Sequence, residues 1–293
     1  MLQFRKVEET DKQLLCDYFE KYARKICDDT VILNLMWAEL FDTELCVFEN
    51  TLYMRSVQDG FVLYCVPMGE NLEKSLKTVK DSAKENNEKF GFFPVLKDEV
   101  DTFTKVFDYT EIFSKQDWYD YVYLAEDLAN FRGKKYHSQK NHINQFTAKY
   151  KNWKFVSITM DMIGDVLDFI YFYSKQNQKD SEMAKEELHQ TMDFVARFED
   201  FGLMGFALLV DEKIVAVEFG EIVDDTFFAH IEKADRDYNG VYSMIVNQVA
   251  KHLLDKNVVY INREEDDGEE GLRISKRRYR PAFQQVKYRI LVD

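Results

Sequence analysis

One order of predicted elements occurs twice along this chain of 293 residues, and it limits the fold more than any other feature. In each half, the spacing of apolar residues predicts a strand, two helices, a meander of three strands, a helix, a strand, a helix and a last strand. The halves show no visible sequence identity, so the repetition lies in the pattern alone. It predicts two structurally similar α+β domains in tandem.

The expected elements indicate where the domains divide. In the first half we expect strands at 2–7, 45–48, 52–57, 61–66, 90–95 and 121–124, and helices at 11–25, 31–40, 72–85 and 99–107. In the second half we expect strands at 153–158, 205–210, 214–221, 226–231, 258–262 and 284–291, and helices at 162–174, 181–198, 241–254 and 268–280. A further helix at about 133–150 joins them, which predicts domains at 1–131 and 132–293.

Composition indicates a soluble protein with aromatic-rich cores. The chain has 24 Phe and 17 Tyr, but only three Pro and 11 Gly, so we expect no long disordered tail. We expect no transmembrane segment, because no apolar run approaches 18 residues, and no signal peptide precedes the first strand. The four cysteines lack the spacing of metal ligands, so we expect buried thiols, no metal site and a reducing cytoplasm.

Charge is strongly segregated along the chain, whose formal net charge is −14. The stretches between Asp127 and Asp161 and between Glu270 and Asp293 contain no acid, and each carries seven Lys or Arg. Because these fourteen cations contribute +14 to the total, the rest of the chain carries −28. Such segregation predicts a local positive site for a ligand rich in phosphate or carboxylate, on a body that repels such ligands.

The second acid-free stretch begins with a cationic helix. Arg273, Lys276, Arg277 and Arg280 recur at i, i+3, i+4 and i+7, so they share one helical face. Like charges at this spacing repel, which favours an anion at that face. In an alternative interpretation, the acidic run 264–270 just upstream only neutralises the helix and caps its N-terminus.

The helix that joins the halves carries the first acid-free stretch. Its spacing places Lys140 and Asn144 on one face and apolar side chains on the other. The polar face is either a phosphate-binding surface or the solvated side of a linker.

Two further segments are candidates for donor binding. Asn262 and Arg263 end a predicted strand, where polar groups often line a cleft, although solvated loop residues look the same. Arg236 and Gly240 lie between a strand and a helix, where the acyl-CoA N-acyltransferases hold the coenzyme pyrophosphate on backbone N–H groups. Only Gly240 matches that loop pattern well, so a plain polar loop remains the alternative.

Candidate acid–base residues lie on the second meander. These are Glu218, His230 and Glu232, and strand alternation places His230 and Glu232 on one face. Partial burial would bring their pKa values near the working pH, as general acid–base catalysis requires. The alternative is that each is a hydrogen-bonded structural group. No Ser-His-Asp order, HExxH motif, Walker loop or paired-carboxylate motif occurs.

Four segments resemble a family of bacterial proteins related to the C-terminal domain of phosphatidylglycerol lysyltransferase: 120–124, 133–146, 262–266 and 271–281. The resemblance spans essentially the whole chain and implies two tandem GNAT-like domains, as in the Fem peptidyltransferases, each a mixed, mostly antiparallel sheet flanked by helices. It further implies transfer of an aminoacyl group from aminoacyl-tRNA to a lipid or a cell-wall peptide, with Lys140, Arg263, Arg273 and Lys276 at the donor site. The membrane part of the lysyltransferase and the helical arm of some Fem proteins have no counterpart in this sequence, which weighs against a lipid acceptor.

Two functional hypotheses follow. In the first, the chain is an acyl or aminoacyl transferase that moves its group from aminoacyl-tRNA or an acyl-CoA to an amine or hydroxyl of a small molecule, peptide or lipid. The degenerate loop at Gly240 favours tRNA, and the net charge of −14 disfavours it. In the second, the chain is a non-catalytic binding module for a phosphorylated ligand or a protein. Neither hypothesis involves DNA.

Overall fold

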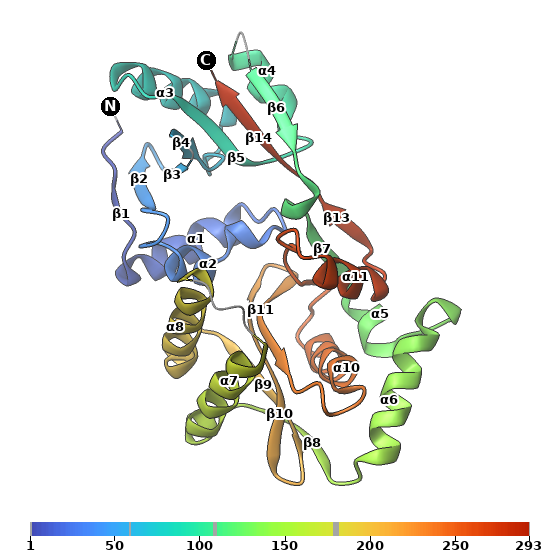
Figure 1. Ribbon diagram of the computed structural model, residues 1–293. Coiled ribbons are helices and arrows are strands. Elements are labelled where there is room, and N and C mark those ends of the chain that lie inside the picture. The colour runs from blue at the N-terminus through green and yellow to red at the C-terminus, as the bar shows by residue number, and fades with distance from the viewer. Residues whose placement is uncertain (1, 59, 108–109, 178–181, 293) are drawn as a thin grey trace. The chain divides into compact units, whose positions relative to one another are not determined.

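The computed structural model describes residues 2–58, 60–107, 110–177 and 182–292, and Figure 1 traces them from blue to red. The chain divides into two compact units. Unit 1 comprises Met1–Asp120, Glu265–Glu270 and Gln284–Asp293, and unit 2 comprises Tyr121–Glu264 and Gly271–Phe283. Each unit is built on one seven-stranded sheet.

The sheet of unit 1 has the order β1-β2-β3-β4-β5-β14-β6. Its strands are β1 (Arg5–Lys6), β2 (Glu44–Phe48), β3 (Thr51–Gln58), β4 (Phe61–Tyr64), β5 (Phe90–Leu96), β6 (Thr110–Ser114) and β14 (Lys287–Val292). The strands β2, β3 and β4 form the expected antiparallel meander, and β4 pairs with β5 in parallel. The last strand of the chain therefore completes the first sheet, between β5 and β6 (Figure 1).

The helices of unit 1 are α1 (Lys12–Lys21), α2 (Val31–Met36), α3 (Leu72–Glu85) and α4 (Val100–Val106). The longest, α3, buries Leu76, Val79 and Ala83 in a core with aromatic residues of β4 and β5. Asn71 caps α3, because its side-chain oxygen accepts the backbone N–H of Lys74. The helix connects β4 to β5, as a parallel strand pair requires.

The sheet of unit 2 has the order β13-β7-β12-β11-β10-β9-β8. Its strands are β7 (Asp120–Leu124), β8 (Trp153–Ser157), β9 (Met204–Val210), β10 (Lys213–Val223), β11 (Thr226–Ala234), β12 (Tyr260–Asn262) and β13 (Phe283–Gln285). Here too, a meander (β9, β10 and β11) is followed by a helix and a parallel strand, β12. The two sheets thus repeat one topology, with a sixth strand from a distant part of the chain in each.

The helices of unit 2 are α5 (Ala125–Asn130), α6 (His137–Lys149), α7 (Ile163–Asn177), α8 (Glu182–Ala196), α9 (Phe198–Phe201), α10 (Val241–Leu254) and α11 (Glu270–Arg278). The core of the unit lies where α10 buries Met244, Ile245 and Val249 against the sheet. The amide of Asn247 donates to the carbonyl oxygens of Leu128 and Ala129, which fixes α5 to α10. Among the described residues, no helix is both long and apolar enough to cross a bilayer.

Candidate functional site

The parallel ladder between β11 and β12 is short, and the candidate site lies where it ends. Only Thr226–Phe228 of β11 pair with β12, through Tyr260–Asn262, whereas β11 continues to Ala234. Beyond Phe228 the two strands are joined by side chains instead. The two residues that follow β12 supply them: Arg263 contacts Glu232 of β11, and Glu264 contacts His230 of β11.

Arg263 makes the first of these links, to Glu232. Its Nε donates to Oε2 of Glu232 at 3.1 Å and its Nη2 donates to Oε1 at 2.8 Å, so the pair is bidentate. The guanidinium also lies 4.7 Å from the ring centroid of Tyr279. Burial alone lowers the pKa of Arg263, but the charge of Glu232 and the weaker effects of Tyr123, Tyr279 and Glu218 together outweigh it, and the pKa is raised. The link is therefore a buried, fully ionised ion pair.

Glu218 lies directly opposite Glu232 in the ladder between β10 and β11. It is only 2% exposed, and burial, followed by the charge of Glu232, raises its pKa well above the ordinary value. Burial beside the carboxylate of Glu232 thus disfavours the charged form of Glu218. Within the described residues, Oε2 of Glu218 and Nη1 of Arg263 are buried with no hydrogen-bond partner. Such orphaned atoms mark a place where a ligand or water completes the cluster.

His230 makes a separate cluster with two acids. Its Nδ1 lies 2.8 Å from Oε1 of Glu264, and its Nε2 lies 3.0 Å from Oε1 of Glu221. Burial lowers the pKa of His230, but the two hydrogen bonds and charges raise it to about 9. Both ring nitrogens therefore donate, and the imidazolium joins β10 to the segment after β12. His230 is the extra residue of a β-bulge, which interrupts the alternation from which we expected it to share a face with Glu232.

The two acid-free stretches meet in unit 2. The amide of Gln139, on α6, donates to the carbonyl oxygen of Arg278, on α11, at 2.7 Å. The hydroxyl of Tyr123 donates to the carbonyl oxygen of Lys276 at 2.7 Å, which holds α11 against β7. Five exposed cations around this junction form no ion pair within the described part of the chain: Lys134, Lys140, Arg277, Arg278 and Arg280. We call these five residues the basic face.

The other predicted donor residues lie on or near the same helices. Lys140 and Asn144 are exposed on α6, and Arg273 is partly buried on α11. The ammonium of Lys276 lies 6.0 Å from the ring centroid of Tyr121. Asn262 is buried, and its side-chain oxygen accepts the backbone N–H of Glu264, so it shapes the strand end.

The loop before α10 packs on α6. Gly240 has φ +84°, and a Cβ at this position would lie 2.2 Å from the carbonyl oxygen of His142. The amide of Asn239 donates to Oε1 of Gln145 at 3.1 Å. Gly240 is thus required for a close helix contact, whereas Arg236 is exposed. The packing against α6 is therefore a sufficient reason for a glycine at position 240, and no pyrophosphate needs to be invoked.

Sequence reasoning missed a buried cluster in unit 1. The ammonium of Lys287 lies 2.5 Å from Oδ2 of Asp28, 2.6 Å from Oδ1 of Asp120 and 3.5 Å from Oε2 of Glu265. Cys27 joins it, with its Sγ 3.3 Å from that ammonium. Burial raises the pKa of Asp120 to about 7. Cys27, Asp28 and Asp120 are close enough together to ligate a metal, but the ammonium of Lys287 lies among them as the cation. Lys287 had counted only as one of the cations of the second acid-free stretch.

Known proteins share this architecture. A conserved protein of unknown function from Bacteroides thetaiotaomicron has a similar structure, with 30% identity, coverage of 100% of both chains and a TM-score of 0.93. L-PGS from Bacillus licheniformis matches with 10% identity and a TM-score of 0.71, over 98% of this chain and 93% of that one. FemX matches with 9% identity and a TM-score of 0.65, over 100% and 98%. No curated protein sequence matches.

The fold is therefore the expected one, two tandem GNAT-like domains of the Fem type. The family model described as "Phosphatidylglycerol lysyltransferase, C-terminal" matches residues 19–291, nearly the whole chain. The chain belongs to this family of phosphatidylglycerol lysyltransferase C-terminal domains.

Proposed function

We propose that the chain is an aminoacyl transferase, which moves an aminoacyl group from aminoacyl-tRNA to an amine or hydroxyl of a small molecule or peptide. The observation that carries the proposal is the buried cluster of Glu218, Glu232 and Arg263 at the open end of the ladder between β11 and β12. Paired carboxyl groups that differ in protonation state are a recurrent device for proton transfer near pH 7. The family supports transfer chemistry, and FemX and L-PGS share the fold.

Glu232 is the proton acceptor in this proposal. Its oxygens each keep a lone pair beyond the bond to Arg263, which holds the carboxylate in one orientation. The acceptor nitrogen or oxygen attacks the ester carbonyl of the donor and gives its proton to Glu232. The same proton then passes to the leaving ribose oxygen as the ester bond breaks, so that atoms and charge balance. In this proposal Glu218 stays protonated, so before the proton transfer Glu218 and Glu232 together carry a single negative charge.

Stabilisation of the developing oxyanion falls to the backbone of β11. Beyond Phe228, β11 has no ladder with β12, so its N–H groups on that side are available to an oxyanion. His230 is in the same segment, but both of its nitrogens are engaged with Glu221 and Glu264. We therefore assign His230 a positioning role, in which it holds the bulged strand in shape.

The donor binds the basic face. Its five cations, on and around two helices, suit the phosphates of a nucleic acid better than one pyrophosphate. The Gly240 loop, where a coenzyme pyrophosphate would sit, is packed on α6 instead. Both features favour aminoacyl-tRNA over an acyl-CoA.

Transfer of radiolabel from a panel of aminoacyl-tRNAs, with cell extract as the source of acceptor, tests the acid–base assignment. Glu232→Gln should lower kcat about 100-fold, because it removes the general base. The matched variant Glu218→Gln replaces one neutral group with another, so it should fold normally, lose less activity, and lack the loss of rate that ionisation of Glu218 causes at high pH.

The thermal melt of each variant controls for folding. A folded Glu232→Gln protein that transfers label at the wild-type rate would rule out the assignment. Binding of tRNA without transfer to any acceptor by the wild-type protein would support the non-catalytic alternative.

A further inference from the structure

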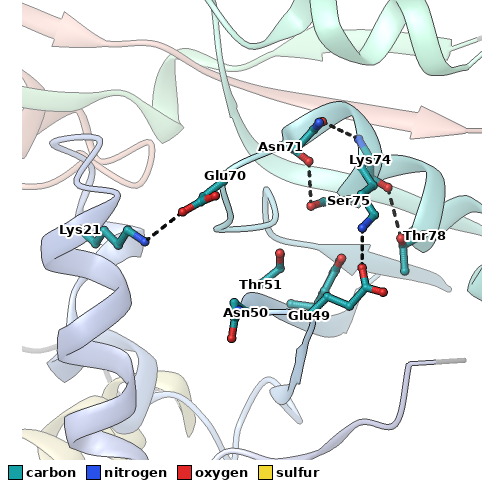
Figure 2. Close-up of a pocket in the computed structure, with 10 residues that line it drawn as sticks. Lys21, Glu49, Asn50, Thr51, Glu70, Asn71, Lys74, Ser75 and Thr78 are labelled. Carbon is teal, nitrogen blue, oxygen red and sulfur yellow. Dashed lines mark hydrogen bonds and ion pairs between the residues drawn. The ribbon is translucent and has the colours of Figure 1, made fainter.

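Unit 1 contains a cavity of about 220 Å³, shown in Figure 2. It lies between α3, the start of β3 and the turn before that strand. Four of its residues, Asn71, Lys74, Ser75 and Thr78, follow i, i+3, i+4 and i+7, so one face of α3 forms a wall. The other lining residues are Lys21, Glu49, Asn50, Thr51, Tyr53 and Glu70. This set is almost wholly polar.

Two of the lining residues are largely buried but have hydroxyl groups that form no hydrogen bond within the described part of the chain. Thr51 is 7% exposed and Tyr53 is 3% exposed, and alternation along β3 places both side chains on the same face of the strand. Neither hydroxyl oxygen is among the fully buried polar atoms without a partner, so both oxygens keep some accessible surface in the cavity lining. Ser75 donates to the carbonyl oxygen of Asn71 and Thr78 to that of Lys74, and the hydroxyl oxygens of Ser75 and Thr78 remain able to accept. Hydroxyl groups of Thr51, Tyr53, Ser75 and Thr78 therefore line the cavity and can hydrogen-bond to a polar ligand.

The charges around the cavity balance. Lys21 lies 3.9 Å from Glu70, and Lys74 lies 2.6 Å from Glu49. In Figure 2 the first pair lies on one side of Thr51 and the second pair on the other. A ligand with a single negative charge would face both carboxylates, and a simple cation would face both ammonium groups. The N-terminus of α3 adds little attraction for an anion, because Asn71 already caps it.

We propose that this cavity binds a small zwitterion, of the class of a free α-amino acid. Its ammonium group faces Glu49 or Glu70, its carboxylate faces Lys74 or Lys21, and Thr51 and Tyr53 hydrogen-bond to it from the floor. The volume fits this class, because drug-sized ligands occupy roughly 300–1,000 Å³. The site lies wholly in unit 1 and does not depend on the reaction proposed for unit 2.

Calorimetric titration of the whole chain tests the proposal with a panel of natural α-amino acids. The single-charge analogues ethylamine and propionate, together with glycerol and inorganic phosphate, complete the set of probes. We expect saturable binding of at least one amino acid, and none of its single-charge analogues. Thr51→Val and Tyr53→Phe should each weaken binding about tenfold, because each deletes one buried hydrogen bond. Tyr288→Phe also deletes a tyrosine hydroxyl, but Tyr288 is on β14 and does not line the cavity, so this control variant should leave binding unchanged.

Several outcomes would overturn the assignment. These are no saturable binding by any amino acid, equal or tighter binding of glycerol or phosphate, or full affinity in both Thr51→Val and Tyr53→Phe. The variant Tyr53→Phe removes one oxygen and leaves the ring in the core, so a failure to fold will not obscure the result.

Discussion

At the scale of single residues, Glu218 and Glu232 show how environment sets the state of identical side chains. Arg263 binds both carboxylate oxygens of Glu232, whereas Glu218 is buried beside that pair, and burial followed by the charge of Glu232 raises the pKa of Glu218 well above its ordinary value. Periodicity could place both residues on the central strands of the second meander. Periodicity could not predict the contact between Arg263 and Glu232, because that contact depends on how β12 and the residue after it pack beside β11.

His230 gives a prediction about pH. Folding raises the pKa of His230 from 6.5 to about 9, so its ion pairs with Glu221 and Glu264 stabilise the fold fully below pH 6.5. That contribution is lost as the pH rises through about 9, and is on the order of 3 kcal/mol. Urea unfolding from pH 6 to 10 should show this loss in the wild-type protein and not in His230→Gln.

The exposed His189, on α8, provides the matched control. His189→Gln should keep the wild-type dependence on pH. If His230→Gln lost stability with rising pH as steeply as the wild-type protein, the imidazolium between two carboxylates would not exist.

At the scale of elements, the helices at 72–85 and 241–254 have the bounds that we expected. Both helices are amphipathic, and the N-cap residue of each, Asn71 or Gly240, marks in the sequence where the helix begins. The strand β6 and the helix α5 were not expected, because both are short and carry weak patterns. The predicted strand 284–291 is two strands, β13 and β14, which enter different sheets. A strand pattern in the sequence cannot distinguish one continuous strand from two strands that are separated by a single residue and pair in different sheets.

Gly240 gives a prediction about how α10 and α6 pack. Gly240→Ala should destabilise the protein by about 2 kcal/mol or more, because it combines a positive φ with a Cβ 2.2 Å from the carbonyl oxygen of His142. Gly164→Ala is the control, since nothing lies within 4 Å of its Cβ, and alanine there should be neutral or slightly stabilising. Denaturant unfolding measures both. Equal stability of the two variants would contradict the tight packing of the loop.

At the scale of the whole molecule, the repeat predicted from the sequence is present, but the chain does not divide once. Each sheet receives its sixth strand from far along the sequence, β14 in the first and β7 in the second. Lys287 lies where the chain returns to unit 1. We counted it as a cation of the second acid-free stretch, but it is paired with Asp120 in unit 1. Its partners Asp28 and Asp120 lie far away in sequence, so only the fold shows that this cation is buried.

The segregation of charge along the chain determines how a nucleic acid could bind to the protein. The basic face consists of five exposed cations that form no ion pair with any described residue, on a chain with a net charge of −14. A nucleic acid donor must therefore bind through a local patch, against repulsion from the rest of the protein. Binding through several phosphates makes transfer strongly dependent on salt.

The most direct test is label transfer from aminoacyl-tRNA at 50 and 200 mM salt, by the wild-type protein and by Lys140→Glu/Arg277→Glu. Lys213→Glu reverses an exposed cation elsewhere in unit 2 and serves as the control. We predict transfer that falls at least tenfold between the two salt concentrations, is lost in the double variant and persists in the control. Transfer by the double variant at the wild-type rate, or transfer by the wild-type protein from acyl-CoA but not from aminoacyl-tRNA, would contradict the account.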